Sequence, residues 1–314
     1  MRLSFPNQYV YKIATDGGFV QEPRMIQPIN MIPNPDNTNQ LISNPDPSLG
    51  LLLTPGERAE VVFSVNGPLF QIEWHDLPIG RHNVVVDVND GTVSAGHSNE
   101  LDGKRPPEVL VEWTVKSKSG MPHYVPPTYL VDIDPIIPPD DAEIITYDFG
   151  HAAPDPTTGD VFFYGEVIDG ENMSFDDITS DMAHKVTAYS THYIDVANKD
   201  GHDHNFHLHG FHFQHVYTHW INKDLSTVKI ETNPYMEWRD TIWMPRRPEA
   251  GGKTVLRLAV KFGKEYEDRD VCATGKVPTD TESGGWLIHC HMFEHGDFGM
   301  ASFLQVVGCG AGDD

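Results

Sequence analysis

The sequence predicts an all-β protein made of sandwich or barrel domains. Short runs rich in Val, Ile, Phe, Tyr and Thr occur throughout the chain, and Gly, Pro, Asn and Asp interrupt them, which is typical of strands joined by turns. Long stretches with helical periodicity are scarce, so helices are not expected to form the core. The clearest predicted strands are residues 60–65, 108–113, 144–147 and 254–258.

The length of 314 residues leaves room for two domains, each able to bury its own core. A proline-laden stretch from Pro122 to Pro139 has no regular hydrophobic pattern, which indicates an extended connection. We therefore expect an N-terminal domain over residues 1–121, a proline-rich linker over 122–140 and a C-terminal domain over 141–314.

The charge of the chain limits its partners. Aspartate and glutamate number 46 against 22 lysines and arginines, which gives a formal net charge of -24. Such a surface repels nucleic acid and anionic membranes, and it favours cationic or neutral partners. No apolar run approaches the roughly 20 residues that span a bilayer, and residues 1–7 lack the apolar region of a signal peptide.

Residues 288–300 contain a set of donors for a redox copper. A thiolate, an imidazole and a thioether select copper and tune its potential, and residues 203–210 can supply one more imidazole. Side chains alternate faces along a strand, so Cys290 points one way while His289 and His291 point the other. A copper held by Cys290 would then have further imidazoles behind it, and a covalent route for an electron.

These two segments resemble the third and fourth copper-binding motifs of the multicopper oxidases, the laccase and bilirubin-oxidase superfamily. In that family the motifs have the forms His-x-x-His-x-His and His-Cys-His-x-x-x-His-x-x-x-x-Met. The resemblance implies a type 1 blue copper with a weak axial thioether, on the ligands His204, Cys290, His295 and Met300. It also implies that the type 2 copper binds His207 and that the type 3 coppers bind His209, His289 and His291.

Further segments extend this resemblance over nearly the whole chain. Residues 11–19 and 53–61 resemble the middle cupredoxin domain of three-domain family members. Residues 168–173 resemble the family's Ile-Asn-Gly turn, and residues 237–241 resemble its Trp-x-Asp-Thr strand. The resemblance implies tandem cupredoxin-like domains, each a Greek-key β-sandwich or barrel.

Two motifs of the form His-x-His, which complete the trinuclear cluster in a first domain, are not found before His202. The early candidates His75 and His82 lack the spacing and are expected to be surface or loop histidines. We therefore expect this chain to be the C-terminal two-thirds of such an oxidase. The first cupredoxin domain would be absent here and supplied in cis or in trans.

The proton donor is an open question in this sequence. Many bacterial relatives have a glutamate directly after the histidine that matches His295, but this chain has Gly296. Asp297 follows, and alternation would point it to the other face of an extended strand. Asp240 is a further acid of unknown proximity.

The sequence also suggests roles for two acids, two cysteines and the additional histidines. Asp203 and Glu294 are candidates for acceptors that orient the neighbouring ligand imidazoles. Cys272 and Cys309 form one disulfide or remain two unrelated thiols, because pairing cannot be deduced from sequence. The additional histidines around the third motif are expected to be outer partners or solvent-exposed, namely His202, His212, His215 and His219.

The resemblance implies a laccase-like oxidase, secreted or periplasmic. Its small reducing substrate would be a phenol, aromatic amine, pigment or metal ion, and Cys290, His289 and His291 would carry the electrons to dioxygen, which becomes water. One alternative is a non-catalytic blue-copper subunit that transfers electrons or binds copper. Another is a two-domain copper nitrite reductase, but a mononuclear catalytic copper does not need imidazoles on both sides of the thiolate.

Overall fold

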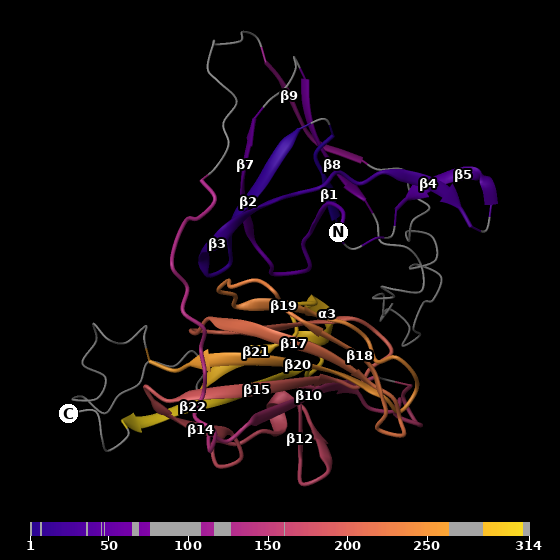
Figure 1. The fold of residues 1–314 in the computed structure, drawn as a ribbon. Helices are drawn as coiled ribbons and strands as arrows, with labels where there is room; N and C mark the ends of the chain where they lie inside the picture. Colours follow the sequence, from indigo (N-terminus) through magenta and orange to yellow (C-terminus); the bar gives the residue numbers. More distant parts are fainter. Residues whose placement is uncertain are drawn as a thin grey trace. The chain divides into compact units, whose positions relative to one another are not determined.

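The computed structural model of the chain (Figure 1) divides into two compact units, Met1–Ile133 and Asp134–Asp314. The structure describes residues 2–6, 8–35, 37–44, 46, 48–64, 69–75, 108–115, 127–159, 161–263 and 285–309. Among these residues no helix has the length and apolar character needed to cross a membrane. Residues 127–140 carry neither helix nor strand, and the linker proposed for 122–140 stays a prediction.

The N-terminal unit is built from short antiparallel strands. They are β1 (Arg2–Ser4), β2 (Tyr9–Thr15), β3 (Gly18–Met25), β4 (Met31–Asn34), β5 (Asn37–Ser43), β6 (Leu51–Leu52), β7 (Ala59–Ser64), β8 (Leu69–His75) and β9 (Glu108–Thr114). One sheet has the order β6-β1-β8-β9, another has the order β3-β2-β7, and β4 pairs with β5. Buried apolar side chains form the core between them, namely Phe5, Val10, Ile26 and Leu51.

The C-terminal unit holds two larger sheets (Figure 1). The first has the order β11-β10-β15-β20-β17-β18, and the second has the order β14-β22-β21-β16-β19. Their strands are β10 (Ile145–His151), β11 (Phe163–Tyr164), β14 (His184–Ala188), β15 (Thr191–Asn198), β16 (His204–Leu208), β17 (Phe213–Ile221), β18 (Thr227–Thr232), β19 (Thr241–Met244), β20 (Lys253–Lys261), β21 (Trp286–His289) and β22 (Ala301–Cys309). Outside the two sheets lie β12 (Glu166–Ile168), β13 (Glu171–Met173), the 3₁₀ turn η1 (Phe175–Asp177) and the short helix α3 (Phe293–Asp297).

Aromatic side chains join the two sheets into a sandwich. The ring of Phe206 on β16 lies 6.1 Å from that of Phe149 on β10 and 5.8 Å from that of Phe213 on β17. All three side chains are fully buried. The prediction of an all-β fold is therefore confirmed, and each of the four strands predicted most clearly overlaps β7, β9, β10 or β20.

His75 differs from its prediction. It ends β8 and is 3% exposed, so the expectation of a surface or loop histidine is wrong. Its Nδ1 lies 2.6 Å from the hydroxyl of Ser43, and the β1–β8 pairing sets it opposite the buried Arg2. Burial and the Arg2 charge together lower the pKa of His75 to about 4. His82, the other early candidate, lies outside the described residues.

Acidification from about pH 6.5 to about pH 4 is expected to lower the free energy of unfolding of the N-terminal unit. In that pH range the unfolded chain binds a proton at His75, whereas the folded chain keeps the ring neutral. The free energy of unfolding therefore falls by at most about 3 kcal/mol. The His75→Asn variant has no ring to protonate and should lose less. Hydrogen–deuterium exchange of β1 and β8, corrected for intrinsic exchange, measures the difference. Equal pH dependence in both proteins would contradict a buried neutral His75.

Candidate metal centre

The pairing of β16 with β21 brings the two histidine motifs together. These strands are antiparallel, with His207 opposite His289 and Leu208 opposite Ile288. Gly210 follows the first motif with a φ of +74°, and a Cβ there would lie 2.4 Å from the ring of Trp286. Only glycine therefore fits the turn that ends the motif.

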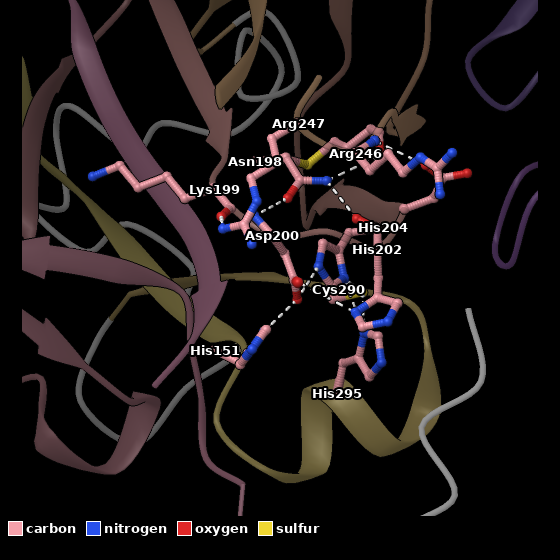
Figure 2. A network of polar contacts seen from close by, with 12 residues as sticks. His151, Asn198, Lys199, Asp200, His202, His204, Arg246, Arg247, Cys290 and His295 are labelled. Atoms are coloured by element: carbon pink, nitrogen blue, oxygen red, sulfur yellow. Dashed lines mark hydrogen bonds and ion pairs between the residues drawn. The ribbon is translucent and has the colours of Figure 1, made fainter. Parts of the chain in front are cut away.

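Three donors converge on one side of this pairing. The Sγ atom of Cys290 lies 3.9 Å from Nδ1 of His204 and 3.7 Å from Nδ1 of His295. The two Nδ1 atoms are 2.9 Å apart. All three residues are buried, and Figure 2 shows their side chains meeting beside α3.

The donor set fits a copper ion. Two donors bonded to one metal at about 2.0–2.3 Å lie about 3–4 Å from each other, which is close to the spacing between Cys290, His204 and His295. One thiolate with two imidazoles is the trigonal set of a blue-copper site. Among the described His, Cys, Asp and Glu side chains, those that could hold this ion together are His204, Cys290 and His295.

The loop after Cys290 closes around the same three donors. The amide of Cys290 donates to the carbonyl of Met300 at 3.0 Å, and the amide of Met300 donates to the carbonyl of His295 at 2.9 Å. Met300 is fully buried. Asp297 ends the helix α3 and does not lie on an extended strand, so the prediction that strand alternation points it to the other face is wrong.

Burial controls the protonation of the two imidazoles differently. His295 stacks on Phe163 at 4.3 Å, and burial together with the charge of His204 lowers its pKa to about 2. Burial also acts to lower the pKa of His204, but hydrogen bonds to Asp200 and Cys290 raise it to about 9. His295 therefore presents a lone pair at neutral pH, whereas metal binding at His204 requires loss of a proton.

Asp200 is the hub behind His204 (Figure 2). Its Oδ2 accepts hydrogen bonds from Nε2 of His204 at 3.1 Å and from Nδ1 of His151 at 2.8 Å. Its Oδ1 lies 3.2 Å from Nδ1 of His202. Burial would raise the pKa of Asp200, but these three imidazoles hold it well below the usual value.

The loop between β15 and β16 fixes Asp200 in place. The Asn198 side chain accepts the Asp200 amide at 2.8 Å, and the Arg247 amide donates to the Asp200 carbonyl at 3.0 Å. The ring nitrogens of His204 face Asp200 and His295, whereas the Asp203 carboxylate accepts the amide of Arg246 at 2.8 Å. The prediction that Asp203 orients this imidazole is therefore wrong.

Four imidazoles gather on the other side of the β16–β21 pairing. The ring of His207 lies 4.8 Å from that of His209, 5.2 Å from that of His289 and 5.0 Å from that of His291. Nε2 of His209 and Nε2 of His289 are 3.1 Å apart. His207, His289 and His291 bring ligand atoms within 4.8 Å of one another.

Hydrogen bonds fix the orientation of two of these rings. Nδ1 of His207 lies 2.8 Å from the hydroxyl of Thr241, which in turn donates to Oδ1 of Asp240 at 2.7 Å. Nδ1 of His289 donates to the carbonyl of Cys290 at 2.9 Å. Each ring is thus left with Nε2 for a ligand, and burial lowers the pKa of His289 to about 4. Asp240, whose position the sequence left open, lies 3.5 Å from His207.

Several residues fall outside the sequence-based hypotheses or remain untested. His151 gave no motif signal, because it lies 49 residues before Asp200 in the chain. Asp200 had a weak signal, since it stands four residues before His204.

Glu294 is exposed on α3. Cys272 lies outside the described residues, so its pairing with Cys309 stays a prediction.

Comparison with known proteins gives a consistent picture. Residues 137–264 match a family model described as multicopper oxidase, whereas a search of curated protein sequences found no match. A multicopper oxidase from Campylobacter jejuni, described as a metallo-oxidase, is similar in structure, with a TM-score of 0.57, 16% identity and coverage of 98% of this chain and 50% of that one.

Two further structures share this fold. The McoA multicopper oxidase from Aquifex aeolicus has a TM-score of 0.53 at 17% identity, with 97% of this chain and 52% of that chain covered. A laccase from Pediococcus acidilactici has a TM-score of 0.53 at 18% identity, with 97% and 46% covered. The chain thus spans about half the length of the solved structures that it matches. The segment that matches the family model contains the third histidine motif, and the fold of the chain is similar to that of these solved structures.

Proposed function

We propose that the C-terminal unit holds a type 1 copper and works in a laccase-like oxidase. The observation that carries this proposal is the division of the donors around Cys290. Its thiol faces His204 and His295 in a buried pocket, whereas its neighbours His289 and His291 join the second imidazole cluster. We assign the axial position to Met300, which is buried and whose main chain bonds to both Cys290 and His295.

Bound copper would supply one-electron redox chemistry at both clusters. The chain itself connects them, because His289 and His291 are covalent neighbours of Cys290. Burial of the Cys290 site excludes water and preserves the donor geometry. In the overall reaction four molecules of a phenol or aromatic amine would each lose one electron and one proton. Dioxygen would take up the four electrons and four protons to give two waters.

We propose that the second cluster is half of a trinuclear site. In this assignment His207 binds the type 2 copper, and the type 3 coppers take His209, His289 and His291. The opposing imidazoles would come from a further cupredoxin domain, in cis or in trans, in a secreted or periplasmic protein. The complete donor set around Cys290 also supports a second candidate, a blue-copper subunit that transfers electrons without reducing dioxygen.

The Cys290→Ser variant is expected to lose the intense visible band of the copper-loaded chain, because that band needs a thiolate ligand. The variant should stay folded, as circular dichroism would show. His219→Gln is a matched control, since His219 bonds to Thr227 away from both clusters and its loss should leave the band intact. Retention of the band without Cys290 would exclude the assignment.

The Met300→Leu variant should keep the blue band and show a higher reduction potential. A weak axial thioether stabilises oxidised copper, so its removal favours the reduced form. Redox titration of the visible band measures the change. An unchanged or lower potential would argue against Met300 as the axial ligand.

The isolated chain is expected to hold about one copper tightly, with any further ions bound weakly. Addition of a cupredoxin domain that carries the two His-x-His motifs should raise copper content and oxygen uptake together. Both gains should disappear in the double variant His289→Ala, His291→Ala. Stoichiometric oxygen uptake by the pure chain with a phenol, or recovery of activity in the double variant, would show that the cluster lies elsewhere.

A further inference from the structure

The strands β11 and β12 lie against the loop that carries His295 and Met300. Phe163 on β11 stacks on His295 with the ring centroids 4.3 Å apart. The amide of Phe163 also donates to the carbonyl of Phe298 at 3.1 Å. One aromatic contact and one main-chain hydrogen bond therefore hold the part of the loop that precedes Met300.

Two further contacts hold the chain just after Met300. A Cβ at Gly165 would clash with the main chain of Ala301, so the two backbones are in close contact. The hydroxyl of Ser302 donates to Oε2 of Glu166 at 2.6 Å. Ser302 is fully buried and Glu166 is 3% exposed, and a buried hydrogen bond to a carboxylate is stronger than one between neutral groups. Glu166 therefore restrains the backbone two residues after Met300.

Glu166 has a second partner, which offsets its buried charge. Nε2 of His184 lies 3.0 Å from Oε1 of Glu166 and 3.2 Å from the carbonyl of Thr146. Burial acts to lower the pKa of His184, but the hydrogen bond to Glu166 and the charge of Glu166 raise it. A carboxylate removed from water is costly unless it is paired. One oxygen of Glu166 is thus used to anchor the side chain, and the other is used to hold Ser302.

Ser302 lies where a shift would move Met300 relative to Cys290. In the pairing of β21 with β22, Ser302 is opposite Ile288, two residues before Cys290. The amide of Cys290 donates to the carbonyl of Met300 at 3.0 Å. The backbone around Ser302 therefore controls where the thioether lies with respect to the thiol, and a weak axial ligand tunes the potential of a blue-copper site.

From these contacts we propose that Glu166 is a positioning residue for Met300, that it acts through Ser302, and that it thereby sets the reduction potential of a bound copper. The inference rests on the proposed function for the copper ligands, but the restraint on the loop can be measured without metal. The competing explanation is that Glu166 acts through its negative charge alone, which would stabilise oxidised copper wherever Met300 lies. The two explanations differ in the effect of Ser302→Ala, which removes the hydrogen bond and keeps the charge.

The first measurement is NMR hydrogen exchange on the copper-free full chain. In Ser302→Ala, exchange at the amides of Cys290 and Met300 is expected to be about tenfold faster or more, the range for loss of a hydrogen bond to a charged group. Glu166→Gln keeps an oxygen that can accept from Ser302, so exchange should remain slow. Unchanged exchange in Ser302→Ala would overturn the proposal, whatever the copper content.

Thr218→Val is the matched control for this measurement. It also removes a buried hydroxyl from the C-terminal unit, but that hydroxyl is on β17 and its partner is Nε2 of His215. Exchange at Met300 should stay slow in this variant. Faster exchange there, equal to that in Ser302→Ala, would show a general loss of stability and would also overturn the proposal.

The second measurement is redox titration of the visible band in the copper-loaded chain. Ser302→Ala should raise the reduction potential, because a thioether that is held less firmly stabilises oxidised copper less. Ser302→Ala should give no further rise when Met300 is already leucine. A rise of equal size in that background, or a larger rise in Glu166→Gln than in Ser302→Ala, would overturn the proposal. Absence of the visible band from the unaltered chain would refute the copper assignment, and the exchange measurement would still decide whether Glu166 restrains Met300.

Discussion

The antiparallel pairing of β16 with β21 is the constraint on which both candidate metal-binding clusters depend. It sets His207 opposite His289, although the two motifs are about 80 residues apart in the sequence. Strand alternation then separates the neighbours of Cys290, so that the thiol and the flanking imidazoles serve different clusters. A shift of one residue in this register would reverse the two faces and dismantle both donor sets at once.

Burial and hydrogen bonding prepare these donors before any metal is present. His295 and His289 are kept neutral by removal from water, which leaves lone pairs for a ligand. Asp200 has the opposite role, because as a buried acceptor it orients His204 and links it to His151. The anchoring of Asp200 by Asn198 makes this hub part of the fold rather than a mobile loop.

Features that depend on local sequence pattern could be predicted from the sequence. Alternation around Cys290 and the motif spacing predicted which donors gather together, and β-rich runs predicted the strands. His151 could not be predicted, because the parallel pairing of β10 with β15 brings it to Asp200 across 49 residues. Asp203 was proposed as the acceptor because it is adjacent to His204 in sequence, whereas Asp200 is the residue that bonds to this imidazole. His75 was misjudged because no local pattern reports burial at the end of a strand.

X-ray absorption at the copper edge, on the chain loaded with one equivalent of copper, tests the central assignment most directly. We expect one short copper–sulfur distance and two copper–nitrogen distances, from Cys290, His204 and His295. Replacement of Cys290 by serine should remove the short sulfur contribution. A first shell of nitrogen and oxygen alone in the unaltered chain would contradict the assignment of a blue-copper site to these residues.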